Sequence, residues 1–177
     1  EDTTPQLGGN LDMQARLLVG NGGSTGIAIS ANGEVTMAAQ PAVLANNSVT
    51  DSNVTGNGAS ATIDFDTEIF DQNADFASDT FTAPITGRYF VAISVQASGS
   101  TASAASASLR HVASNRTFNS YSNPGTPDCS NQVSAIVDMD AADTLTVVFR
   151  VTGESSDVVD INGSSDMGTR ISICLLV

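Results

Sequence analysis

The sequence contains no lysine and no tryptophan, and it has only one histidine, His111, among its 177 residues. Without lysine a phosphate-binding P-loop cannot form, so we interpret the glycine-rich stretch 20–26 as a turn. One histidine is too few for a histidine-based zinc site or a two-histidine iron site within one chain. Since no other catalytic constellation replaces these, we predict that the protein is not an enzyme.

Positive charge is also scarce. The chain has 19 acidic and 6 basic residues, all of the latter arginine, and a formal net charge of -13. Such a chain repels phosphate backbones and anionic lipid surfaces, so we expect no nucleic-acid partner. No segment approaches the roughly 20 apolar residues of a membrane span, so we expect no membrane insertion.

Only two cysteines occur, Cys129 and Cys174. Two are too few for a disulfide scaffold, and both one disulfide and two free thiols remain open. Because the chain begins with Glu1 rather than Met, we expect a processed or trimmed start.

What the sequence has in abundance is β-type alternation from about residue 61 onward. Apolar residues recur at every second position, which is typical of half-buried strands. Turn signals such as Asn123-Pro124-Gly125 and Asn162-Gly163 separate these runs, which predicts an all-β sandwich or barrel. The alternating sets are Ile63, Phe65 and Ile69; Tyr89, Val91, Ile93 and Val95; Val133, Ala135, Val137 and Met139; Leu145, Val147, Phe149 and Val151; Ile171, Ile173, Leu175 and Val177.

Two further regions precede this head of residues 61–177. Residues 1–40 contain short β-like pieces separated by Asn-Gly pairs, and strands this short cannot bury a face alone. We predict a β-rich stem and attachment segment there, β-prism-like once several copies wrap around one axis; disorder before assembly is the alternative. Residues 41–60 are polar and are predicted to be a linker.

Acidic residues suggest two kinds of site. Asp64, Asp66 and Glu68 lie on one face of an expected strand, and we interpret them as a solvated face rather than as the catalytic carboxylates of a glycosidase. Asp138, Asp140 and Asp143 cluster at one turn and form a candidate calcium site, because calcium prefers several oxygens from acidic loops.

The region from Ile63 to Val177 resembles the globular head of complement's first component and its relatives in the tumour-necrosis-factor superfamily. The resemblance rests on Ile69-Phe70-Asp71-x-Asn73 and on the block from Phe81 to Phe90, Phe-x-x-Pro-x-x-Gly-x-Tyr-Phe. Two weaker matches follow, one from Asp140 to Val147, where Ala142 replaces a glycine, and one from Thr169 to Leu176, where the family's aromatics are missing and Cys174 departs from the pattern.

This resemblance implies a jelly-roll head that forms homotrimers. The residues Tyr89 and Phe90 would face opposite ways, into the core and toward a neighbour. Leu175 and Leu176 also lie on opposite faces of the last strand, and two apolar faces require a partner. We therefore assign Tyr89, Phe90, Leu175 and Leu176 to core and trimer packing.

The N-terminal segment 4–13 is similar to segments of bacteriophage tail fibres and other virion structural proteins. It implies a virion fibre protein that is extracellular, binds other virion proteins through the stem and contacts a host-surface glycan or protein. Arg116 and Tyr121, in the expected apical loops 114–127 and 153–167, are the candidate receptor contacts. The alternatives are a capsid-decorating or filament subunit without a receptor, a secreted ligand, and a polysaccharide depolymerase.

Overall fold

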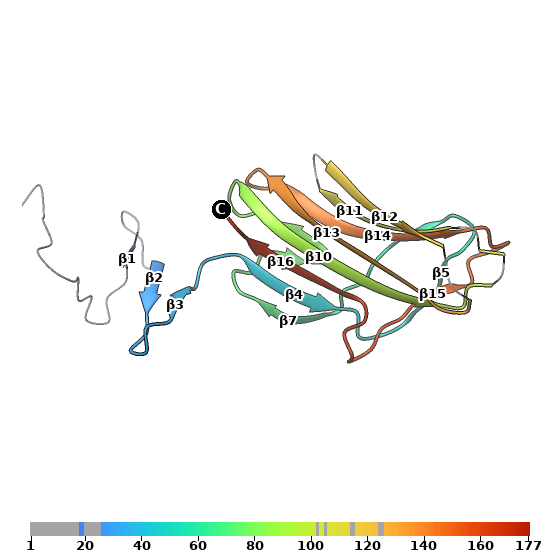
Figure 1. Ribbon diagram of the computed structural model, residues 1–177, viewed down its shortest axis with the longest axis horizontal. Coiled ribbons are helices and arrows are strands. Elements are labelled where there is room, and N and C mark those ends of the chain that lie inside the picture. The colour runs from blue at the N-terminus through green and yellow to red at the C-terminus, as the bar shows by residue number, and fades with distance from the viewer. Residues whose placement is uncertain (1–17, 20–25, 102, 105, 114–115, 124–125) are drawn as a thin grey trace, which may run out of the picture. The chain divides into compact units, whose positions relative to one another are not determined.

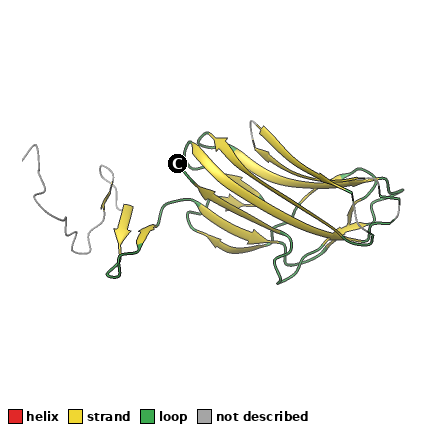
Figure 2. Ribbon diagram, in the orientation of Figure 1, coloured by secondary structure: helices red, strands yellow, loops and turns green. Residues whose placement is uncertain are grey.

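The structure, a computed structural model, describes residues 18–19, 26–101, 103–104, 106–113, 116–123 and 126–177. It divides into two units, Glu1–Ala39 and Gln40–Val177. The described residues form strands, turns and loops (Figure 2). The segment 4–13, on which the virion resemblance rests, lies outside the described residues.

The N-terminal unit contains one small antiparallel sheet in the order β1 (Leu18–Val19), β2 (Gly26–Ile29) and β3 (Val35–Met37). The turn between β2 and β3 falls at the Asn32-Gly33 pair, where Gly33 has a φ of 93°. Because residues with a side chain rarely adopt this backbone conformation, glycine at position 33 permits the turn.

The C-terminal unit is a jelly roll of two antiparallel sheets (Figure 1). The first sheet has the order β5 (Asp51–Thr55), β15 (Val159–Ile161), β10 (Gly87–Ser98), β16 (Arg170–Leu175), β4 (Ala42–Asn46) and β7 (Thr67–Asp71), and β13 (Cys129–Met139) also pairs with β10. The second has the order β12 (Arg116–Ser122), β11 (Ser106–Ala113), β14 (Thr144–Thr152), β9 (Thr80–Thr82) and β8 (Phe76–Ala77), and β6 (Ser60–Thr62) pairs with β14.

The core lies between the two sheets and follows the expected alternation closely. Tyr89 is fully buried, its ring meets Phe81 edge-on at 5.4 Å between centroids, and its hydroxyl donates to the Ile85 carbonyl at 2.7 Å. Two positions depart from the pattern: Ile69 and Val177 are exposed. Ile69 leaves the alternation because residues 63–66 are not part of a regular strand and β7 begins only at Thr67.

Residues 41–60 differ from the expected linker, because they contain β4, β5 and the start of β6. Val43 and Ala45 of β4 are buried in the core, and β4 pairs with the C-terminal strand β16. Two of the polar residues that suggested a linker, Asn46 and Asn47, are themselves buried. Asn47, for example, donates through Nδ2 to Asp51 Oδ2 at 2.7 Å and accepts from Val49 N at 3.0 Å.

The last strand is central, as its apolar ending predicts: β16 lies between β10 and β4. Both cysteines are free thiols. Their partners in β10 explain why, since Cys129 is opposite Ala97 and Cys174 opposite Phe90. Seven residues along a strand span about 23 Å, whereas a disulfide requires Cα atoms within about 7 Å.

Among the described residues, no helix is long and apolar enough to cross a membrane.

Candidate functional site

The most distinctive surface of the head is the outer side of its first sheet. On β13, β10, β16 and β4 every second side chain points away from the core, and Phe70 of β7 lies beside Leu44 on the same side. These outward side chains form what we call the exposed sheet face. Side chains opposite each other in the ladders lie close together on the same side, so the register shows which residues meet across the strands.

Two neighbouring rows of the exposed sheet face are rich in apolar side chains. In the first row the ladders join Ile136 to Phe90, Phe90 to Cys174, and Cys174 to Ala42. The second row runs from Ser134 through Ala92, Ser172 and Leu44 to Phe70. Ile136 is 57% exposed, Phe70 49% and Phe90 39%, which is high for large apolar side chains.

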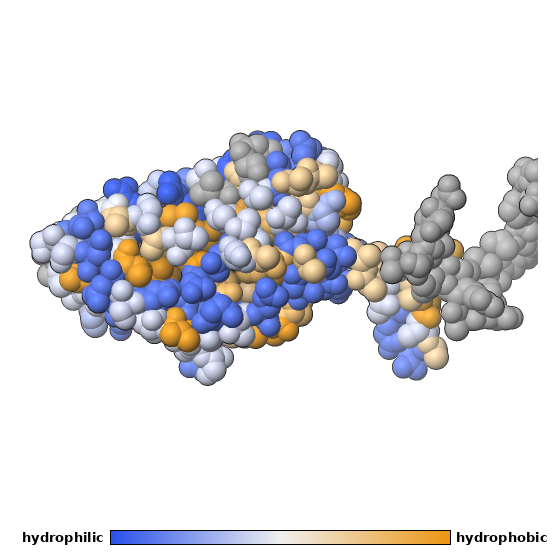
Figure 3. All heavy atoms as spheres, turned by 180° about the vertical axis from the view of Figure 1, so that it is seen from behind, coloured by the Kyte–Doolittle hydropathy of each residue, from blue (hydrophilic) through white to orange (hydrophobic). Residues whose placement is uncertain are grey.

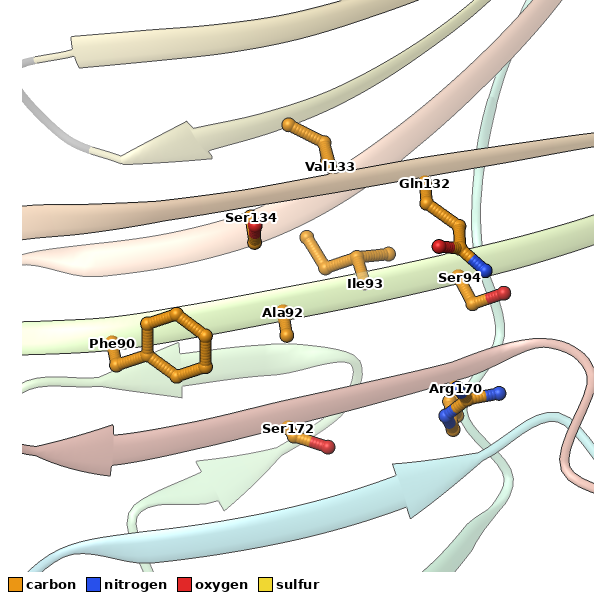
Figure 4. A pocket seen from close by; sticks show the side chains of 9 residues that line it. All are labelled: Phe90, Ala92, Ile93, Ser94, Gln132, Val133, Ser134, Arg170 and Ser172. Carbon is orange, nitrogen blue, oxygen red and sulfur yellow. The ribbon is translucent and has the colours of Figure 1, made fainter.

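A hollow of about 340 Å³ lies on this face (Figure 4). Its middle is built from short side chains, Ala92, Ser134 and Ser172, which leave space above the sheet. Phe90 stands at one end, and Gln132 and Arg170 stand at the other. The hollow is therefore open, apolar at one end and hydrogen-bonding at the other.

Charged residues border the apolar rows. At one end Asp138 faces Arg88 across the ladder and forms a two-pronged ion pair with Arg116, with both contacts at 2.6 Å. The hydrogen bonds from Arg116 lower the pKa of Asp138, and they raise the pKa of Arg116. At the other end Arg170 donates to the carbonyl of Met167 at 2.8 Å.

The outer side of the second sheet has a different chemistry. Its outward residues on β11 and β14 include Ser106, Ser108, Thr144 and Arg150, and those on β12 are Thr117, Asn119 and Tyr121. Such a polar face is stable in water, whereas the exposed sheet face of the first sheet is not a typical solvated surface. On the side of the head seen in Figure 3, apolar residues occur as separate patches among hydrophilic ones.

The structure separates the two candidate receptor residues. Residues 116–122 form the edge strand β12 rather than an apical loop. Arg116 is at the start of this strand and its guanidinium is bound to Asp138, while Tyr121 is near the other end, 73% exposed, on the opposite side of the strand. They therefore do not form one site, although Tyr121 remains available to a ligand.

The candidate calcium residues are occupied by contacts within the protein. Asp138 binds Arg116, Asp143 accepts from the backbone N–H of Asp140 at 3.0 Å, and Asp140 accepts from the Thr86 hydroxyl at 3.5 Å. No group of three or more acidic, histidine or cysteine side chains suited to a metal ion is found in the part of the chain that the structure describes. Calcium at this turn stays a prediction.

The residues assigned to packing take different positions. Tyr89 is in the core, Phe90 is on the exposed sheet face, Leu175 packs partly against the core and Leu176 is exposed beyond the end of β16. Sequence reasoning missed Ile136, Phe70, Leu44 and Arg170. Ile136 interrupts the alternation of Val133 to Met139 as an apolar residue in the outward phase, and this signal was available in the sequence.

The head has the fold of complement-type and tumour-necrosis-factor-type jelly rolls. The structure is similar to the globular domain of the zebrafish complement 1qA protein, with a TM-score of 0.57 and 12% sequence identity over 78% of this chain and 98% of that chain. It is also similar to murine APRIL at pH 5.0, with a TM-score of 0.54 and 12% identity over 77% of this chain and 99% of the other. No protein-family model matches the sequence, and no curated protein matches it significantly.

Proposed function

We propose that this chain is a non-enzymatic, extracellular fibre protein whose jelly-roll head forms a homotrimer through the exposed sheet face. The observation that carries the proposal is the pair of apolar rows across β13, β10, β16, β4 and β7. Apolar surface removed from water contributes roughly 25 cal/mol per Å², so a large uncovered face favours association. The number three is what the resemblance to the complement head implies.

The shape of the face supports packing between copies. The hollow between Phe90 and Arg170 is floored by short side chains, so it has room for a bulky side chain of a neighbouring copy. Arg170 and Gln132 at its rim supply donors to a carboxylate or carbonyl of that copy. Apolar contacts at one end of the hollow and hydrogen bonds at the other would match the mixed chemistry of protein interfaces.

The version that we favour is a fibre of a virion, bound to other virion proteins through the N-terminal unit. The support is the resemblance of segment 4–13 to phage tail fibres, together with the short, turn-separated strands that follow it. Contact with a host-surface glycan or protein belongs to this version, with exposed Tyr121 as a candidate stacking residue.

A secreted ligand-type trimer is the second candidate. It is favoured by the similarity of the head to the zebrafish complement domain and to murine APRIL over nearly the whole length of those chains. Both candidates require the trimer, and they differ in whether the N-terminal unit is an ordered stem.

The trimer is tested by light scattering coupled to size-exclusion chromatography. We expect a mass near 54 kDa, which is three times the 18.1 kDa of the chain. The substitutions Ile136→Lys and Phe90→Lys place a charge in the first apolar row and should shift the mass to that of one chain.

Thr117→Lys is the matched control, because it adds the same charge to the polar outer side of the second sheet. Its mass should remain that of three chains. A wild-type protein that elutes as a stable single chain would contradict the proposal, as would dissociation of the control to the same extent as Ile136→Lys.

A further inference from the structure

Five large apolar side chains of the three-stranded sheet in the N-terminal unit point to the same side. The ladders place Leu18 opposite Ile27, Ile27 opposite Met37, and Ile29 opposite Val35. Because Ile27 and Ile29 are two residues apart on β2, and Val35 and Met37 two apart on β3, all these side chains point to the same side. Ala28 and Thr36, which pair with each other, point to the opposite side. The apolar stem face consists of Leu18, Ile27, Ile29, Val35 and Met37.

The apolar stem face is exposed among the residues of this unit that the structure describes. Its five side chains are between 39% and 60% exposed. A sheet with one apolar side is stable only when another layer covers that side, and three short strands do not bury enough surface otherwise. The face therefore requires an occupant from outside this small sheet.

The geometry points to further copies of the same sheet as the occupant, so that the apolar stem faces of three chains meet around one axis. Charge supports this choice. Each chain carries a net charge of -13, so copies can approach closely only where both surfaces lack acidic groups. Among residues 26–39 the only charged residue is Glu34, which lies in the turn, where its carboxylate accepts a hydrogen bond from the Ser30 hydroxyl.

The apolar stem face is small, so its association depends on contacts made elsewhere in the chain. Five side chains per copy are far fewer than the roughly 20–30 residues per side of a standard interface, so this face alone cannot hold two chains together. Heads that are already associated raise the effective concentration of the attached segments to about the millimolar range. The inference thus rests on the proposed trimer of heads, which fixes the number of copies.

Cysteine cross-linking in the full-length chain tests the inference. In a Cys174→Ser background, Ile29→Cys and Val35→Cys each place a thiol on the apolar stem face, and Thr36→Cys places one on the opposite side of β3. The buried Cys129 is kept in all variants. Mild oxidation should produce covalent dimers from Ile29→Cys or Val35→Cys on the order of tenfold faster than from Thr36→Cys.

The mass of the same samples before oxidation separates the two proposals. A mass of three chains with rapid cross-linking on the apolar stem face only is the expected result. A mass of three chains with equal or no cross-linking at the three positions would contradict the association of the stem faces and leave the trimer of heads intact. This result is expected if another protein, or the head, covers the apolar stem face. A mass of one chain overturns both.

Discussion

At the scale of single residues, four aspartates from three separate segments of the chain come together. The charges of Asp64, Asp66 and Asp79 act on Asp51, and those of Asp66 and Asp79 act on Asp64. Burial raises the pKa of Asp64, and the neighbouring charges of Asp79 and Asp66 raise it further. Burial likewise raises the pKa of Asp51. Burial of Asp66 would raise its pKa, but hydrogen bonds from Ser48, Thr67 and Val49 together lower it.

The raised pKa of Asp64 predicts the effect of Asp64→Asn. When the pKa of a carboxyl is higher in the folded than in the unfolded state, ionisation of that carboxyl disfavours folding. The wild-type protein therefore loses stability as the pH rises through the pKa that Asp64 has in the folded state. At pH 7 the variant should be more stable than the wild type, but by no more than about 0.5 kcal/mol, because solvent screens the charges at this largely exposed site. The advantage should disappear as the pH falls toward the ordinary aspartate range near about 4.

Thermal unfolding between pH 7 and pH 4 measures this difference. Asp128→Asn is the control, because it also removes one negative charge but from an exposed position outside these four aspartates. If Asp64→Asn were less stable than the wild type at pH 7, the repulsion inferred here would be disproved, since the carboxylate would then make a net favourable contribution.

Residue patterns explain why the core was predictable and the site was not. Every second position from Tyr89 to Val95 and from Leu145 to Val151 is apolar, and these positions form the buried face of their strands. The exposed sheet face depends on which outward residues become neighbours. Ile136 and Phe90 are 46 positions apart in sequence and meet only through the β10–β13 ladder. No local pattern specifies that register.

At the scale of elements, the strands β4 and β12 show why segment boundaries were harder to predict. The polar run at Asn46-Asn47-Ser48 suggested a linker, yet the asparagines are buried and hydrogen-bonded to the loop that precedes β16; Asn46, for example, donates to the Ser164 carbonyl. Residues 116–122 contain Asn, Ser and Thr and suggested a loop. They form β12 because pairing with β11 along its whole length outweighs weak intrinsic strand preference.

The loop before β16 yields a prediction about Gly163. This residue sits against the turn after β4, where its N–H donates to the Thr50 hydroxyl at 3.2 Å. A Cβ added at Gly163 would collide with the backbone of Val49 and with Asn47 Oδ1. Because backbone cannot move away without shifting β4, Gly163→Ala should destabilise the fold by about 1–3 kcal/mol, which lowers the melting temperature by several degrees.

Gly168→Ala is the informative comparison for this loop. There the added Cβ would meet the end of the Gln96 side chain, which can rotate away. Calorimetry or circular dichroism should therefore show a clearly smaller loss of melting temperature than for Gly163→Ala. Equal losses would mean that the contact with the Val49 backbone is not what fixes glycine at position 163.

At the scale of the whole molecule, association and charge oppose each other. Three copies with a net charge of -13 each bring -39 together, so the apolar rows must outweigh a large electrostatic repulsion. Salt screens that repulsion: the Debye length falls from about 30 Å at 0.01 M to about 8 Å at 0.15 M. The free energy contributed by burial of apolar surface does not weaken over this range of salt concentration. The balance therefore shifts toward association as salt is added.

The trimer should accordingly dissociate more readily at low salt, in contrast to an interface held by ion pairs. In a dilution series followed by sedimentation or light scattering, the concentration at which the complex dissociates should be on the order of tenfold higher in 10 mM than in 150 mM sodium chloride. The single-chain variant Ile136→Lys provides the control, because its melting temperature over the same range isolates the repulsion within one chain. A trimer that instead becomes tighter at low salt would show that attraction between opposite charges, such as Arg170 and an acidic group of the neighbouring copy, outweighs the apolar rows as the source of its stability.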